Sequence, residues 1–167
     1  MNAAGQISIT VRNRQRVRRV NTRLLKKIAA STLAEVGITR CDLCFHLVAA
    51  KEMSRINWQF LQHEGSTDVI TFDHSEPATE NSKPGAIISG EIFICLDAAV
   101  KQAKEFETLW QSELVRYAIH GILHLLGHDD LKPAARTQMK REENRLVLEI
   151  EATFEILKLG NPKRSSA

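Results

Sequence analysis

Hydrophobic and polar residues alternate in two separated stretches of the chain, at 7–11 and at 41–47. A period of two is typical of a β-strand that buries one face, because successive side chains point to opposite sides of a sheet. Two further stretches, 68–73 and 86–95, are rich in β-branched and aromatic residues, which favour extended backbone. The pattern therefore predicts four strands.

Between and after these stretches, apolar positions recur with the spacing of amphipathic helices. Asn21 can cap the first helix and Gly37 can stop it, while Asp97 can cap a later helix and Pro133 suits a first turn. The expected helices cover 21–36, 53–62, 97–106, 108–126 and 133–158.

Polar residues and two prolines at 74–85 predict a loop or lid, and residues 161–167 are expected to be a disordered tail. Neither an internal repeat nor a linker divides the rest of the sequence. The expected fold is α+β, with one domain over residues 1–160 and a mixed sheet of about four strands covered by helices.

The composition is that of a soluble globular protein, with 43% hydrophobic and 26% charged residues. No apolar run approaches the ~20 residues that span a bilayer, and the N-terminus lacks the apolar centre of a signal peptide. Three cysteines, an odd number, favour a reducing compartment. We therefore expect a cytoplasmic protein without a membrane partner.

Cys41 and Cys44 have the C-x-x-C spacing found in redox and zinc sites. In a strand, however, residues three apart point to opposite faces, and no second cysteine pair is present to complete a structural site. We interpret both as ordinary small side chains.

Basic residues are concentrated near the N-terminus. Residues 1–30 carry eight Arg and Lys and no acidic residue, which leaves 15 basic against 20 acidic residues in the remainder. This basic N-terminal segment is either a solvated face or a strip that contacts nucleic-acid phosphates. Its members are Arg12, Arg14, Arg16, Arg18, Arg19, Arg23, Lys26 and Lys27.

The stretch HGILHLLGHDD, at 120–130, carries the most specific chemistry. His120 and His124 are four residues apart in an apolar run, so in a helix they lie about 40° apart around the axis and project from one face. Gly127 stands where such a helix ends, and the following turn offers Asp130 as a third ligand. This is the spacing of a catalytic zinc site with three protein ligands and a fourth position for water.

Alternatives remain for these residues. A histidine pair in an apolar helix can simply be a hydrogen-bonded part of the core. His128 competes with Asp130 as third ligand, but it follows His124 too closely if the chain must turn at Gly127. Gly121 occupies the position where protein-cleaving zinc enzymes carry a glutamate as general base, which argues against a peptidase.

Three blocks of the chain together resemble the YbeY family of bacterial rRNA-maturation endoribonucleases. They are INWQFLQHEGSTDVITFD at 56–73, SGEIFICLDAAVKQA at 89–103 and HGILHLLGHDD at 120–130, and a weaker block, MKREEN, follows at 139–144. The resemblance implies a zincin-like, metalloprotease-like α+β fold, one zinc ion per chain and no small-molecule cofactor. It also implies an endoribonuclease specific for single-stranded RNA, acting on the 3′ end of 16S rRNA and in ribosome quality control. The implied partners are rRNA and the small ribosomal subunit.

Two positions depart from the commonest pattern of that family. Asp130 stands where the third ligand is usually histidine, although carboxylate oxygen also binds zinc well. Leu61 stands where the family commonly has an arginine thought to assist catalysis. Arg55 or another cation would then supply that charge, and His63 is a further candidate for contact with RNA.

A zinc ion held by His120, His124 and Asp130 would lower the pKa of its bound water toward ~7 and polarise a phosphoryl oxygen. The 2′-hydroxyl of RNA is an alternative nucleophile, and the sequence does not choose between the two. Glu113 and Tyr117 share the histidine face of the helix, so Glu113 can orient an imidazole, or else serve in capping or a surface ion pair.

The leading hypothesis is therefore a zinc-dependent endoribonuclease. The main alternative, motivated by Leu61, is a ribosome-associated RNA-binding protein whose zinc is mainly structural. A zinc metallopeptidase is the third hypothesis.

Overall fold

The computed structural model describes residues 5–77 and 87–160. Its strands are β1 (Ile7–Asn13), β2 (Cys41–Val48), β3 (Val69–Asp73) and β4 (Ile88–Cys95), in the spatial order β1-β2-β4-β3. β1, β2 and β4 run parallel, and β3 pairs antiparallel with β4 at one edge. The predicted mixed sheet and the α+β class are confirmed.

Five α-helices and a short 3-10 helix accompany the sheet in the described part of the chain. They are α1 (Thr22–Glu35), α2 (Ala50–Leu61), α3 (Leu96–Glu105), α4 (Trp110–Leu125), α5 (Pro133–Thr153) and η1 (Ile156–Leu159). The side chain of Asn21 caps α1 as predicted, accepting a hydrogen bond from the backbone N–H of Leu24 at 3.1 Å. Gly37, with φ +76°, follows the end of α1.

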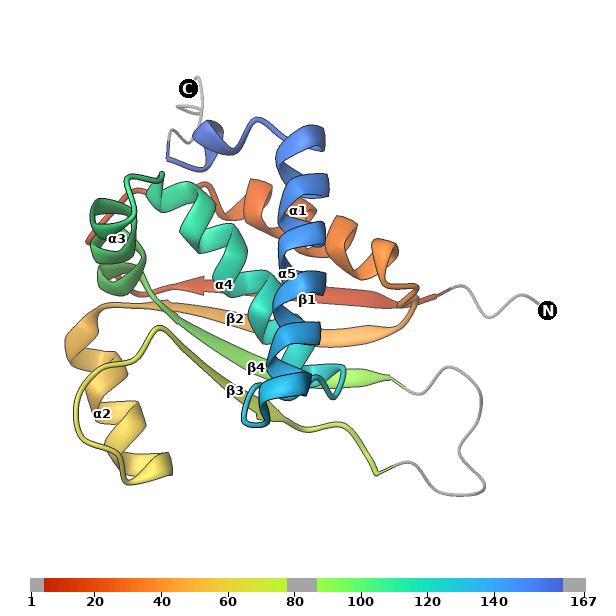
Figure 1. Cartoon of the computed structure of the whole chain (residues 1–167), viewed down its shortest axis with the longest axis horizontal. Coiled ribbons are helices and arrows are strands. Elements are labelled where there is room, and N and C mark those ends of the chain that lie inside the picture. Colours follow the sequence, from red (N-terminus) through yellow and green to blue (C-terminus); the bar gives the residue numbers. More distant parts are fainter. Residues whose placement is uncertain (1–4, 78–86, 161–167) are drawn as a thin grey trace.

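The two faces of the sheet are covered unequally (Figure 1). On one face, Phe45 of β2 and Ile92 of β4 belong to the main core, which they share with α1, α4 and α5. On the other face, α2 packs a smaller cluster, in which Met53 and Ile56 lie with Phe93. The main core therefore lies between the sheet and the helix that carries the predicted metal ligands.

Two helix boundaries differ from the sequence prediction. Asp97 does not cap α3; its carboxylate accepts a hydrogen bond from the backbone N–H of Ala50 at 2.6 Å, so it caps α2, which begins earlier than predicted. α5 ends at Thr153 and not near Lys158, because the chain bends to bury Leu159 against the main core. Both differences come from contacts between distant segments, which local periodicity does not report.

The cysteines behave as predicted. Cys41 is buried, Cys44 is half-buried and every cysteine of the chain, including Cys95, is a free thiol. Most of the loop predicted at 74–85 and all of the tail at 161–167 lie outside the described residues. Among the described helices, none is both long enough and apolar enough to cross a membrane.

Candidate metal centre

α4 is the central helix of the protein, and its sequence explains why it carries the site. Most of its side chains are buried, and it packs on β3, β4, α1, α3 and α5. His120 and His124 lie one turn apart on the remaining strip, where their side chains are 27% and 26% exposed. The two imidazole rings therefore reach solvent, whereas most of the other side chains of α4 are buried.

The turn after α4 brings the chain back over these histidines. Gly127 has φ +91°, a left-handed conformation that glycine adopts without steric cost. Its backbone N–H donates to the oxygen of His124 at 3.0 Å, and the N–H of His128 donates to the oxygen of Leu123 at 3.0 Å. This pair of bonds is a Schellman motif, which caps the helix and turns the chain, so that Asp130 follows close to the imidazoles.

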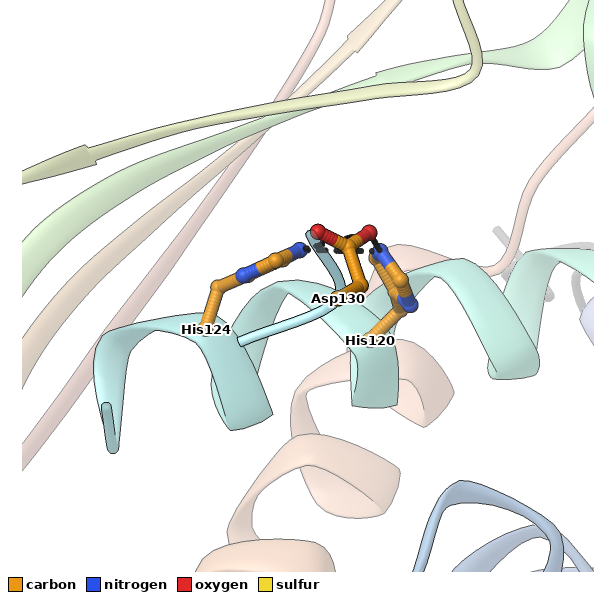
Figure 2. Close-up of side chains that lie close together, drawn as sticks. All are labelled: His120, His124 and Asp130. Carbon is orange, nitrogen blue, oxygen red and sulfur yellow. Dashed lines mark hydrogen bonds and ion pairs between the residues drawn. The ribbon is translucent and has the colours of Figure 1, made fainter. Parts of the chain in front are cut away.

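Three side chains converge beyond this turn, and Figure 2 shows the carboxylate of Asp130 reaching between the two rings. The Nε2 atoms of His120 and His124 are 3.0 Å apart, and Oδ2 of Asp130 lies 3.8 Å from the first and 3.6 Å from the second. Among the described residues, these three form the group whose donor atoms are close enough to share a metal ion. The imidazole of His128, the alternative third ligand, is not part of it.

Each imidazole of the pair is held through its other nitrogen. Nδ1 of His120 lies 2.9 Å from Oε2 of Glu143 on α5, and Nδ1 of His124 lies 3.2 Å from the backbone oxygen of His128. A carboxylate and a carbonyl only accept hydrogen bonds, so both Nδ1 atoms carry a proton. In the neutral rings, both Nε2 atoms then point lone pairs at one another and at the Asp130 carboxylate, which is repulsive unless a cation lies among them.

Glu143 is the buried centre of a small ion network. Nη1 of Arg116 donates to its Oε1 at 2.8 Å and to Oδ1 of Asn144 at 2.7 Å. Burial works to raise the pKa of Glu143, but the hydrogen bonds from His120 and Arg116 outweigh it and lower that pKa. Burial likewise works to lower the pKa of His120, and its bond to the anionic Glu143 reverses the sign. Glu143 therefore stays ionised and holds the ring.

A metal-site cavity of about 280 Å³ is lined by His120 and Asp130, and Arg136 and Lys140 of α5 form another part of its wall. A second cavity of about 290 Å³ shares Asp68, Gln102 and Tyr117 with the first, so the two adjoin. Burial raises the pKa of Tyr117, so the phenol between the cavities remains protonated. Two of the three donors, those of His120 and Asp130, thus line one of two adjoining cavities.

The other candidates from the sequence hold neither imidazole of the pair. Glu113 accepts a hydrogen bond from the hydroxyl of Thr108 at 2.9 Å, so it secures the start of α4 and holds neither imidazole, although it lines the metal-site cavity. Arg55 bonds to Gln59 within α2. Neither Arg55 nor His63 lines either of the two cavities.

Sequence reasoning missed Glu143, which holds His120, and Arg116, which holds Glu143. The available signal was the MKREEN block at 139–144, which contains Glu143. Its role depends on how α5 packs against α4, and helical periodicity alone does not specify that packing.

The basic N-terminal segment lies at the other end of α4. Its arginines at 14–20 stand in the connection between β1 and α1, and Asn21 then bonds to Leu159 in η1, which packs against α4. Gly160, directly after η1, lies against the first residues of α4, whereas His120 is ~15 Å of helix farther along. No residue of the segment lines either of the two cavities.

Gly121 faces the sheet. A Cβ added at this position would lie 2.5 Å from Cγ2 of Ile92 on β4, far inside van der Waals contact. A glutamate directly after the first histidine would therefore have to displace the side chain of Ile92 in the core. The general base of a zinc peptidase does not fit at this position.

A second histidine–carboxylate cluster lies on the opposite face of the sheet. Oε1 of Glu91 is 2.8 Å from Nε2 of His46, and its Oε2 is 3.0 Å from Nε2 of His74. The ring of His46 stacks on Phe93 with centroids 4.2 Å apart, and its buried Nδ1 has no hydrogen-bond partner among the described residues. Hydrogen bonds from His74 and, to a smaller extent, from His46 lower the pKa of Glu91.

Comparison with known proteins agrees with the resemblance seen in the sequence. Residues 6–151 match the family described as Endoribonuclease YbeY. The curated YbeY endoribonuclease of Chlorobium phaeovibrioides is 36% identical over 121 residues, which cover 72% of this chain and 76% of that protein. The one from Parabacteroides distasonis is 40% identical over 104 residues, covering 62% of this chain and 68% of that protein.

The fold also matches a solved structure. The solution structure of TM1509 from Thermotoga maritima aligns with a TM-score of 0.61, over 95% of this chain and 99% of that one. The sequences are 23% identical, so this likeness concerns the fold alone.

Proposed function

This chain belongs to the endoribonuclease YbeY family, and we propose that it is a zinc-dependent enzyme that cleaves single-stranded RNA. Its substrate is the 3′ end of 16S rRNA, in the maturation and quality control of the small ribosomal subunit in the cytoplasm. His120, His124 and Asp130 hold one zinc ion per chain, and no small-molecule cofactor takes part.

The observation that carries this proposal is the convergence of two imidazole lone pairs and one carboxylate. Ligands bound tetrahedrally to zinc at about 2.0–2.1 Å lie roughly 3.4 Å from one another. The three separations between the donor atoms, 3.0, 3.6 and 3.8 Å, bracket that value. Two imidazole nitrogens with one carboxylate oxygen are a donor set that suits zinc.

When bound, zinc supplies Lewis acidity toward a phosphoryl oxygen and toward water. The residues of the chain prepare the ligands for this task. Glu143 keeps the proton on Nδ1 of His120, and the backbone oxygen of His128 does the same for His124, so both Nε2 atoms present lone pairs. Arg116 keeps Glu143 ionised, and the ligand geometry therefore persists at neutral pH.

The test compares the zinc-loaded protein with His120→Ala on a single-stranded RNA substrate. We expect cleavage that requires zinc, stops on chelation and is lost in the variant. Cleavage by the variant at the rate of the wild type would contradict the proposal. Co-sedimentation with small ribosomal subunits tests the proposed site of action.

A second candidate is an RNA-binding protein with structural zinc. It is favoured by Leu61, which is 44% exposed at the end of α2 and brings no charge to the position. In that case the protein binds RNA and zinc, but RNA incubated with it stays intact. The same cleavage assay therefore separates the two functions.

A further inference from the structure

Three side chains of α5 face the metal-site cavity from one side of that helix. Arg136, Lys140 and Glu143 follow one another at spacings of four and three residues, which aligns them in a row along one helix face. Glu143 is the member that holds His120. The same row therefore sets two cations beside the proposed zinc ligands.

Arg136 is fixed in place by the turn that carries the third ligand. Its Nε donates to the backbone oxygen of Asp130 at 2.8 Å. Within the described part of the chain, the guanidinium makes no other hydrogen bond or ion pair, so its terminal N–H groups are available. Arginine with one edge anchored presents the other edge as a preorganised fork.

Lys140 stands one turn farther along α5 and is exposed. Its ammonium has no hydrogen-bond or ion-pair partner among residues 5–77 and 87–160. Arg116, the remaining cation of the cavity wall, differs from both because Glu143 and Asn144 occupy it. The available cationic donors of this cavity are therefore those of Arg136 and Lys140.

The charge balance of the cavity shows what these donors can do. Four carboxylates line it against three cations, an excess of one negative charge. A divalent ion among the ligands changes this to an excess of one positive charge. An anionic phosphodiester then meets a favourable potential only with the metal and both free cations in place.

We propose that Arg136 and Lys140 bind the phosphate of the RNA strand next to the zinc ion. This inference rests on the proposed function. Guanidinium and ammonium groups form strong, charge-assisted hydrogen bonds to phosphate oxygens.

The experiment measures binding of a fluorescent single-stranded oligoribonucleotide, 2′-O-methylated and checked for integrity on a gel, at several salt concentrations. Lys140→Ala should weaken binding about tenfold and reduce the slope of log Kd against log salt by about 0.7, the contribution of one phosphate contact to a single strand. Zinc content should not change, because Lys140 touches no ligand.

Arg141→Ala is the matched control. It removes the same charge from the next residue of α5, which is exposed and does not line the cavity. Its Kd should stay within about twofold of the wild type. Arg136→Ala should weaken both RNA binding and zinc binding, because it also releases the Asp130 turn.

Equal effects of Lys140→Ala and Arg141→Ala would overturn the proposal, since they would indicate a general charge effect. So would an unchanged slope in Lys140→Ala together with a flattened slope when Arg16, Arg18 and Arg19 are all alanine. A wild type that binds RNA but lacks zinc-dependent cleavage would instead refute the proposed function, while the binding comparison still stands.

Discussion

Two clusters in this protein join histidines to a carboxylate, and they are built in opposite ways. At the end of α4, Glu143 bonds to Nδ1 of His120, and the Nε2 atom on the far side of the ring points at a second imidazole. On the other face of the sheet, Glu91 bonds to Nε2 of both His46 and His74.

The nitrogen that the carboxylate leaves free decides what such a cluster can do. In the α4 cluster, the carboxylate holds the nitrogen nearer the backbone and leaves the outer one free to bind a metal. In the sheet cluster the carboxylate occupies the outer nitrogens, and the inner nitrogen of His46 is buried against the sheet. The first arrangement is suited to binding a metal, whereas the second joins strands and the segment after β3.

The largest expected difference between the two clusters appears when one histidine of each is replaced by alanine. His120→Ala should reduce bound zinc and RNA cleavage to the level of the chelated wild type, because it removes one of three ligands. His74→Ala, at an exposed position, should leave both unchanged. Zinc per chain by atomic emission and a gel assay of cleavage check both variants. Loss of zinc in His74→Ala would break the distinction between the clusters.

A smaller effect is expected when the carboxylate is neutralised. Glu143→Gln should weaken zinc binding by about 10–100-fold, the usual cost of losing the partner that orients a ligand histidine. Glu91→Gln should leave the zinc Kd unchanged. Competition with a chromophoric chelator measures both values. A Glu143→Gln protein that binds zinc like the wild type would show that His120 needs no such partner.

The sheet cluster should instead appear in the acid stability of the metal-free protein. The pKa of Glu91 lies below its ordinary value of 4.5, so the unfolded chain takes up this proton first. The stabilisation from Glu91 is therefore present above that value and is lost as the pH falls below it. For a carboxylate this exposed it amounts to less than about 1 kcal/mol.

Urea unfolding of the wild type and of Glu91→Gln between pH 5.5 and pH 3.5 measures this contribution. The advantage of the wild type should shrink as the pH falls. An advantage that grows toward pH 3.5 would mean that the folded state raises the pKa of Glu91.

The smallest effect is expected at Glu113, which lines the metal-site cavity but bonds to Thr108. Glu113→Gln should change the zinc Kd by less than about twofold, because no imidazole depends on it. The chelator competition used for Glu143 applies here too. A loss as large as that of Glu143→Gln would assign the orienting role to both carboxylates.

Much of the fold followed from local sequence patterns. The strands and the first helix were predicted because alternation, the Asn21 cap and the Gly37 stop act within a few residues of chain. The role of Asp97 was predicted wrongly, because its carboxylate caps a helix that lies far away in the sequence. The order of the strands likewise depends on long-range pairing that no local pattern encodes.

The candidate site, too, was predicted only as far as local spacing determines it. The grouping of His120, His124 and Asp130 was predicted because helix spacing and one glycine turn determine it. The hydrogen bond that holds His120 was not predicted, because Glu143 reaches it from a different helix. Spacing within a segment thus indicated which three side chains lie together, and packing between segments determined what orients His120.

The three side chains proposed to bind zinc come from one short stretch of chain, folded back on itself at Gly127. Closing so short a loop costs little entropy, so a single turn of helix in an otherwise unfolded chain can already bind the ion. A ligand that also binds the unfolded chain protects the native fold less than its native affinity suggests. Zinc should therefore raise the thermal midpoint of this protein only modestly.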